Sequence, residues 1–248
     1  MTPPTMRNPV IAALLGASLA VAGAAHAGPA SSIHTPVVEN GETEFELKNG
    51  WREFDGGLEE HASVFEVGRG VNDHWFTELE LEQSFEDGGP NHLESWEWEN
   101  IFALTERGKY WMDVGLFAAY EHTFDPHDPN QIVLGPMFMK DIGPVTANVN
   151  LLFKRQLGSG ASHQTELDYQ WQARWHGRES LEFGLQGMGE AGVLGHLGQD
   201  QSHIAGPALF GAHRTGNGKI KWNAAVLAGL DRNAPNVTIR TQLEYEMH

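Results

Sequence analysis

The candidate chemical groups of this sequence are rows of acidic side chains. In the stretch WFTELELEQSF, residues 75–85, the carboxylates of Glu78, Glu80 and Glu82 stand at every second position, with Leu79 and Leu81 between them. A helix, at 3.6 residues per turn, would mix these acids with the leucines around its axis, whereas a strand sends alternate residues to opposite faces. The stretch therefore predicts a strand with one acidic face and one apolar face.

The same alternation recurs along the chain and indicates which surroundings the two faces meet. Residues 110–120 form an apolar face capped by Tyr110 and Tyr120, and residues 165–175 and 220–228 also separate an apolar from a polar face. Aromatic caps at both ends of an apolar band are typical of strands that cross a bilayer. We therefore predict that Leu79 and Leu81 face lipid and that the acids face a polar lumen. A soluble β-sandwich also alternates and is the alternative.

Turn-forming residues set the number of strands. Clusters of Gly, Pro, Asn and Asp divide residues 41–248 into twelve segments. With one near tie, the breaks are alternately longer and shorter, as the external loops and periplasmic turns of outer-membrane barrels are. The longest predicted connection runs from Gly189 to Gln201. The fold class predicted is all-β: an antiparallel, up-and-down transmembrane β-barrel of about twelve strands, residues 41–248.

The N-terminal residues predict export. Arg7 precedes an uncharged run over residues 10–25, and Ala25-His26-Ala27 offers a small-x-small cleavage site before Gly28. Residues 1–27 are therefore predicted to be a signal peptide, with an uncleaved membrane-anchoring N-terminus as the alternative. Residues 28–40 are predicted to be a periplasmic N-terminal tail, and the sequence leaves open whether this tail is free or plugs the barrel.

Composition excludes several classes of function. The formal net charge of −17 argues against nucleic acid and against anionic lipid as partners. The sequence has no cysteine, which excludes disulfides, thiol catalysis and cysteine-ligated metals. Beyond residue 27, no run approaches 18 consecutive apolar residues, so the sequence predicts no helical membrane span.

The predicted lumen-lining side chains lie on the polar faces of the alternating segments. They are Glu78, Glu80, Glu82, Glu97, Glu99, Asp113, Glu166, Asp168, Arg174 and Arg240. An acid-rich wall favours cations in a narrow pore, which predicts a porin-like passive channel or transporter for a small polar or cationic solute. The alternative is that salt bridges fill a closed barrel with a structural or surface-binding role and no pore.

Metal and catalytic motifs are weak. His122, Asp125, His127 and Asp128 are candidate metal ligands, but Asp-Pro-His-Asp-Pro-Asn equally forms a plain turn, so no metal and no cofactor is predicted. The pairs Ser162-His163 and Ser202-His203 would point to opposite faces of a strand, and the sequence contains no Gly-x-Ser-x-Gly. We therefore predict that the chain is not an enzyme.

The C-terminus carries a resemblance. Residues 237–248 alternate and end LEYEMH, which resembles the C-terminal signal of bacterial outer-membrane barrels, although Met247 and His248 replace the usual closing aromatic residue. The resemblance implies the outer membrane of a Gram-negative bacterium, with outer-membrane lipid and the barrel assembly machinery as partners.

A second resemblance covers most of the chain after residue 27. The run over residues 97–121 and the closing LEYE resemble a group of proteobacterial outer-membrane barrels, similar in style to transporter-like barrels of the phenol-degradation MetA type. This resemblance implies fold and location, whereas the small polar solute predicted as a partner follows from the lumen charges. It carries no catalytic motif and does not predict the oligomeric state.

Overall fold

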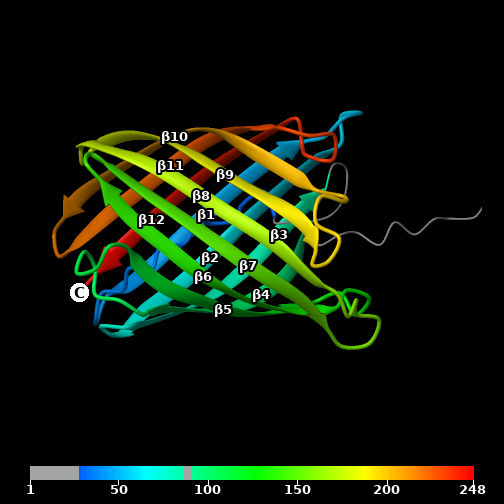
Figure 1. Ribbon diagram of the computed structural model, residues 1–248, viewed down its shortest axis with the longest axis horizontal. Helices are drawn as coiled ribbons and strands as arrows, with labels where there is room; N and C mark the ends of the chain where they lie inside the picture. The colour runs from blue at the N-terminus through cyan, green and yellow to red at the C-terminus, as the bar shows by residue number, and fades with distance from the viewer. Residues whose placement is uncertain (1–27, 87–90) are drawn as a thin grey trace, which may run out of the picture.

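Twelve antiparallel strands close into a barrel in the computed structural model, which describes residues 28–86 and 91–248 (Figure 1). The strands are β1 (Thr43–Glu53), β2 (Glu59–Asn72), β3 (Trp75–Glu86), β4 (His92–Ala103), β5 (Asp113–Thr123), β6 (Asn130–Ile142), β7 (Val145–Leu157), β8 (Thr165–Arg178), β9 (Leu181–Val193), β10 (Ser202–Thr215), β11 (Gly218–Gly229) and β12 (Val237–Met247). Each strand pairs with its neighbours in sequence. The predicted fold class and strand number are confirmed.

The barrel closes between its first and last strands. β1 pairs with β12 in an unbroken register from Thr43 opposite Met247 to Glu53 opposite Val237. Closure leaves the sheet without an unpaired edge, which is the condition for spanning a bilayer with strands. The predicted signal peptide and the predicted turn at residues 87–90 lie outside the described residues. Within those residues no helix is long and apolar enough to cross a membrane.

The two ends of the barrel differ in their connections. Residues 73–74, 143–144, 179–180 and 216–217 are tight turns at the end where β1 begins and β12 ends, which we call the turn end. The opposite, loop end carries residues 54–58, 124–129, 158–164, 194–201 and 230–236 between strands. This asymmetry matches short periplasmic turns and longer external loops.

Two predicted boundaries were wrong. β9 continues to Val193, so the stretch predicted as the longest loop is partly strand: a side chain at Gly189 would overlap the His203 ring and the Tyr169 hydroxyl, and the glycine there makes room for them. Conversely, residues 104–112 at the turn end are the longest connection within the described ranges. Tyr110 lies in this connection and not on a strand, because β5 begins at Asp113, whose carboxylate accepts a 2.7 Å hydrogen bond from the Gly108 amide.

The two faces of the wall follow the alternation. Leu79 and Leu81 are 55% and 39% exposed on the outside of the barrel, whereas Glu78 and Glu80 are 8% and 7% exposed. The other large apolar side chains that face outward include Phe45, Leu47, Phe65, Val67, Leu134, Phe183, Leu209, Val226, Ile239 and Leu243. An apolar outer face on a closed barrel belongs in lipid, and the protein is an outer-membrane β-barrel, as predicted.

Candidate functional site

The interior of the barrel carries a large excess of buried acidic groups. Among the described residues, eleven acidic side chains are buried against three basic ones. The acids are Glu42, Glu46, Glu66, Glu78, Glu80, Glu99, Asp113, Asp168, Glu182, Glu244 and Glu246, and the bases are Lys48, Arg52 and Arg240. Buried charges are stable only when they are paired, protonated or bound to cations.

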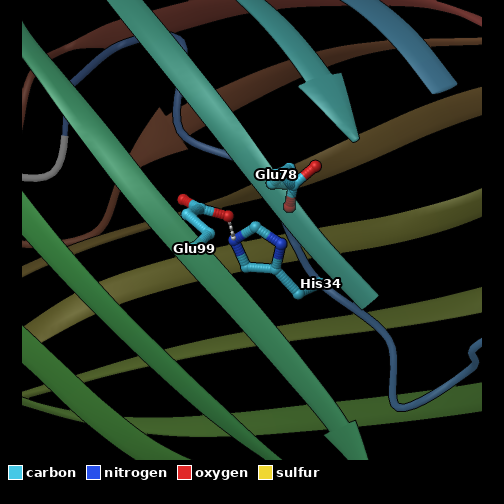
Figure 2. A group of neighbouring side chains, drawn as sticks. All are labelled: His34, Glu78 and Glu99. Carbon is cyan, nitrogen blue, oxygen red and sulfur yellow. Dashed lines mark ion pairs between the residues drawn. The ribbon is translucent and has the colours of Figure 1, made fainter. Parts of the chain in front are cut away.

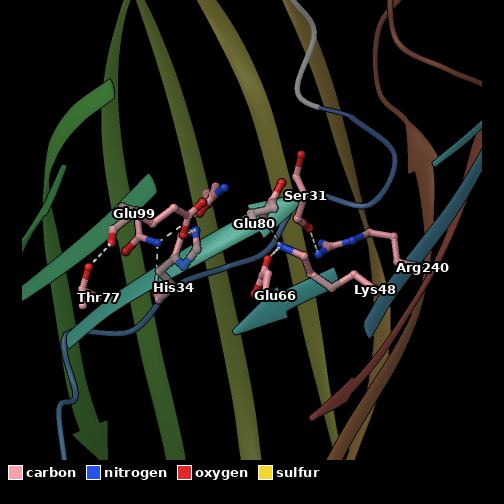
Figure 3. Close-up of polar contacts among 10 residues, drawn as sticks. Ser31, His34, Lys48, Glu66, Thr77, Glu80, Glu99 and Arg240 are labelled. Atoms are coloured by element: carbon pink, nitrogen blue, oxygen red, sulfur yellow. Dashed lines mark hydrogen bonds and ion pairs between the residues drawn. The ribbon is translucent and has the colours of Figure 1, made fainter. Parts of the chain in front are cut away.

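Lys48 is the central cation of this wall. It is 3% exposed, its ammonium lies 2.9 Å from a Glu80 oxygen, and it also pairs with Glu66 (Figure 3). The three residues lie on neighbouring strands, β1, β2 and β3, and all point inward because of the period of two. One lysine therefore forms ion pairs with two of the buried carboxylates.

Other basic side chains pair with acids further round the wall. Lys154 on β7 lies 2.7 Å from Asp168 on β8. Arg174 on β8 pairs with Glu182 on β9 and stacks over the Phe210 ring, 4.9 Å from its centroid. These pairs neutralise part of the lumen and leave a net excess of acid.

The N-terminal segment, residues 28–42, lies inside the barrel, so the question that the sequence left open has a structural answer. Its apolar side chains pack into apolar patches of the inner wall. Ala30 packs with Ala62 and Val64, while Ile33 packs against the cluster around Phe210. Val38 packs against a third cluster, which consists of Phe76, Ile101, Phe117, Ala119, Val133, Met137 and Leu152. The lumen is thus partly apolar where the segment crosses it.

Polar contacts fix the middle of the segment. The His34 carbonyl accepts hydrogen bonds of 2.9 Å from the side-chain amides of both Asn148 and Asn150, which are 2% and 0% exposed. The His34 ring stacks on Phe117 with centroids 4.5 Å apart. Arg240 donates to the Ser31 carbonyl (Figure 3). The segment is therefore held by specific partners and not only by apolar contact.

Glycines in the wall allow this close approach. A Cβ at Gly50 on β1 would overlap the Pro29 carbonyl, and a Cβ at Gly70 on β2 would overlap the Glu39 carbonyl. Backbone atoms cannot rotate away as a flexible side chain can, so a larger residue at either position must displace the segment. Gly70 also exchanges two 2.9 Å backbone hydrogen bonds with Gly41 and Glu42, which anchors the segment at the turn end.

Two cavities flank the segment. The loop-end cavity has a volume of about 530 Å³ and is bordered by Glu82, Glu97 and Asp128. The turn-end cavity has a volume of about 370 Å³ and is bordered by Glu44 and Lys221. Ser32 and His34 border both cavities. The segment thus separates two water-accessible cavities along the axis of the barrel.

His34 is neutral in this setting. Burial and the nearby Lys48 charge lower the pKa of His34, which lies on the N-terminal segment and not on a membrane-spanning strand, to about 3. A neutral imidazole keeps a lone pair on one ring nitrogen and can accept a hydrogen bond or bind a metal.

The structure places the predicted lumen residues in several groups. Glu78 and Glu99 stand directly opposite each other on β3 and β4, and Glu80 belongs to the Lys48 group. Glu82 and Glu97 border the loop-end cavity, and Arg174 borders the turn-end cavity. The other four do not share one site: Asp113 caps the 104–112 connection, Asp168 pairs with Lys154, Glu166 stands opposite Lys154 in the register, and Arg240 holds the N-terminal segment.

The candidate metal ligands at the β5–β6 connection do not assemble. His122 bonds to Asn130 at 2.9 Å, and Asp125 accepts a 2.7 Å hydrogen bond from the His127 amide. In the described part of the chain, the groups of acids and histidines close enough to hold one ion exclude these four residues, His122, Asp125, His127 and Asp128. Their side chains serve the turn.

The sequence reasoning missed His34 and Lys48. Lys48 follows Glu44 and Glu46 at every second position, a signal that could have placed it on the inner face of β1. His34 lies in a segment without periodicity, and its neighbours come from β3, β4, β5 and β7. Only the closed barrel brings these residues together.

Comparison with known proteins supports the fold. No protein-family model and no curated protein sequence matches the chain. The COG4313 outer membrane channel from Pseudomonas putida F1 has a TM-score of 0.58 to this chain, at 11% identity over 88% of this chain and 99% of its own. The Acinetobacter baumannii outer membrane protein Omp33 has a TM-score of 0.42, at 9% identity over 85% and 100%. The first of these likenesses shows the fold alone, and the finer resemblance to the MetA type stays a prediction.

The prediction that the chain is not an enzyme was wrong, because it excluded catalytic activity from sequence motifs alone. The solved barrels with a related fold include outer membrane phospholipase A from Escherichia coli, with a TM-score of 0.42 and 12% identity over 83% of this chain and 90% of its own. The barrel fold alone does not exclude an enzyme. At this identity, the likeness does not show that this chain is an enzyme either.

The physical reason for this correction is that strands far apart in sequence meet in a barrel. Neighbouring Ser-His pairs and the Gly-x-Ser-x-Gly motif do not reveal groups that meet in this way. In the structure, the Thr146 hydroxyl lies 2.6 Å from His176 Nε2, and His176 Nδ1 lies 3.2 Å from Glu182. Thr146 also donates to Asp141, which points its proton away from the imidazole. Hydroxyl, imidazole and carboxylate thus meet from three strands without any sequence motif.

Proposed function

We propose that the protein is an outer-membrane channel for a small polar or cationic solute, and that the N-terminal segment obstructs its lumen in the state described here. The observation that carries this proposal is the excess of buried acids on the inner wall, eleven against three buried bases among the described residues. A single-sign lumen concentrates the opposite ion and repels the same sign.

The two cavities support a path along the axis of the barrel. The loop-end cavity has Glu82 and Glu97 on its border, and the turn-end cavity has Glu44 and Glu246. Acidic groups therefore stand on both sides of the N-terminal segment, where an entering cation would first meet the wall. We propose that the solute passes when the segment leaves its place between the cavities.

A second candidate function is favoured by the segment itself. Its apolar packing and its hydrogen bonds to Asn148, Asn150 and Arg240 support a barrel that is closed for good and has a structural or surface-binding role. The two functions differ in one measurable property, because only a channel carries current.

The predicted cleavage after Ala27 fits this arrangement. In the proposed mature chain, which begins at Gly28, this first residue lies close to the Glu82 carboxylate, since a Cβ on Gly28 would lie 2.9 Å from Glu82 Oε1. A positive charge at this point would help to seat the segment in an acidic lumen.

Reversal potential under a salt gradient tests the proposal. The chain is folded in detergent, inserted into planar bilayers and compared with the double variant Glu78→Gln and Glu80→Gln. Cation preference that weakens in this variant supports the acid-lined channel. A matched control is Glu106→Gln on the exposed 104–112 connection, which should leave selectivity unchanged because that side chain borders neither cavity. Current steps without any cation preference would contradict the acid-lined path.

A further inference from the structure

Three side chains meet where the N-terminal segment passes the inner faces of β3 and β4. They are His34 on the segment, Glu78 on β3 and Glu99 on β4 (Figure 2). One ligand atom from each lies within 4.8 Å of the other two. His34 Nε2 lies 3.6 Å from Glu99 Oε2. Four-coordinate Zn²⁺ with ligands at about 2.1 Å places neighbouring ligand atoms about 3.4 Å apart, so small side-chain shifts complete the geometry.

A second observation points to a missing ligand at this place. Glu99 is 4% exposed, and its Oε2, the atom that faces His34, is buried without a hydrogen-bond partner. An unpaired carboxylate oxygen in the interior is costly, and such groups usually have a partner or a bound ion. His34 Nε2, at 3.6 Å, is too far from this oxygen to form a hydrogen bond with it.

The two carboxyl groups also need a cation between them. Glu78 and Glu99 are direct cross-strand partners, and like charges in this position destabilise a sheet. Lys48 pairs with Glu66 and Glu80 and does not reach this pair as an ion-pair partner. A divalent ion between the two carboxylates would offset this repulsion.

We propose that His34, Glu78 and Glu99 form a binding site for a divalent first-row transition metal of the Zn²⁺ class. One imidazole nitrogen and two carboxylate oxygens suit such an ion better than Ca²⁺ or Mg²⁺, which prefer oxygen ligands alone. Three protein ligands leave one position for water, and water can reach the site because His34 borders both cavities.

The ligand set is held in place before any ion arrives. The Asn148 and Asn150 amides fix the His34 backbone, and the Phe117 ring fixes the imidazole plane. The two glutamates stand on paired strands of the closed wall. A bound ion would therefore join the N-terminal segment to the wall. Its further effect, to favour the obstructed state over the open one, rests on the proposed channel function.

Titration calorimetry of the full chain, folded in detergent after removal of metal, tests the site with Zn²⁺ in an excess of Mg²⁺. The expected result is one Zn²⁺ per chain that Mg²⁺ does not displace. His34→Gln and Glu99→Gln should each lower this affinity on the order of 100-fold, since even indirect disturbance of metal ligands costs about 10-fold to 100-fold. Matched controls are Glu106→Gln on the exposed 104–112 connection and His127→Gln in a loop, and both should bind as the parent does.

A second measurement needs no variant. Co²⁺ added to the unmodified chain should give the visible absorption of a four-coordinate ion with nitrogen and oxygen ligands. The proposal is overturned if Mg²⁺ abolishes Zn²⁺ binding, if His34→Gln binds Zn²⁺ as tightly as the parent, or if Co²⁺ shows only its six-coordinate aqueous spectrum. None of these results depends on ion conduction, so the metal site and the channel can fail separately.

Discussion

Substitution of Gly50 tests the position of the N-terminal segment most directly. A valine there places a side chain onto the Pro29 carbonyl, and the backbone cannot yield without moving the segment. Overpacking of this kind costs about 1–3 kcal/mol. Because the substitution strains only the docked state, the population of chains with an undocked segment should rise by a factor of about 5 to 150.

Thiol labelling measures this population directly, because the chain has no cysteine of its own. Ser32→Cys introduces one thiol on the segment, at a side chain that is 8% exposed and whose hydroxyl makes no hydrogen bond that the substitution would remove. A small water-soluble reagent reaches this thiol when the segment undocks. Its rate in Gly50→Val should therefore exceed the parent rate by the same factor.

The control is a glycine on another strand of the wall where an added side chain would have no close neighbour. A Cβ at Gly177 has no heavy atom within 4 Å, so Gly177→Val with Ser32→Cys should label at the parent rate. Electrophoretic mobility without boiling verifies that both barrels are folded. Equal labelling rates in Gly50→Val and the parent would refute the packing of the segment against β1.

Three further predictions concern the wall and the outer face. Lys48→Met leaves the buried carboxylates of Glu66 and Glu80 without their cation and should lower the free energy of unfolding by about 3–5 kcal/mol in urea titrations. Adding Glu66→Gln and Glu80→Gln should restore most of this loss, and an equally unstable triple variant would contradict the pairing. Asn150→Leu removes one of the two amide donors to the His34 carbonyl and should raise Ser32→Cys labelling, since one such hydrogen bond contributes about 0.5–1.5 kcal/mol; an unchanged rate would argue against this anchor. Leu79→Arg places a charge on the outer face and should destabilise the barrel in lipid vesicles by up to about 2–4 kcal/mol, whereas no loss would place this face outside the bilayer.

The fold was predictable because the strand pattern is local. Alternation in residues 75–85 requires a strand, and turn residues at regular intervals separate the twelve strands without any long-range information. The predicted ends of strands were wrong where a residue type that is common in loops, or one that fits the alternation, has another role in the structure. Gly189 is typical of a loop, but within β9 it makes room for the Tyr169 and His203 side chains. Tyr110 continues the alternation although β5 begins only at Asp113.

The site was predictable only in part, for a physical reason. The inward acids follow from alternation, but their partners are set by the register of strands that are remote in sequence. Lys48 on β1 reaches Glu80 on β3 across the intervening strand β2. His34 lies near Glu99 only because the N-terminal segment turns back through the barrel. Residues 28–42 have no periodic pattern that would show this path.

The central claim is that an acid-lined path exists and that the N-terminal segment obstructs it. Single-channel recording of the whole chain beside a chain that lacks residues 28–40 tests this claim most directly. No strand includes these residues, so the barrel should still fold. We predict rare openings in the whole chain and frequent, cation-selective steps in the shortened chain. A folded shortened barrel that carries no current would contradict the channel and leave the closed, structural or binding barrel.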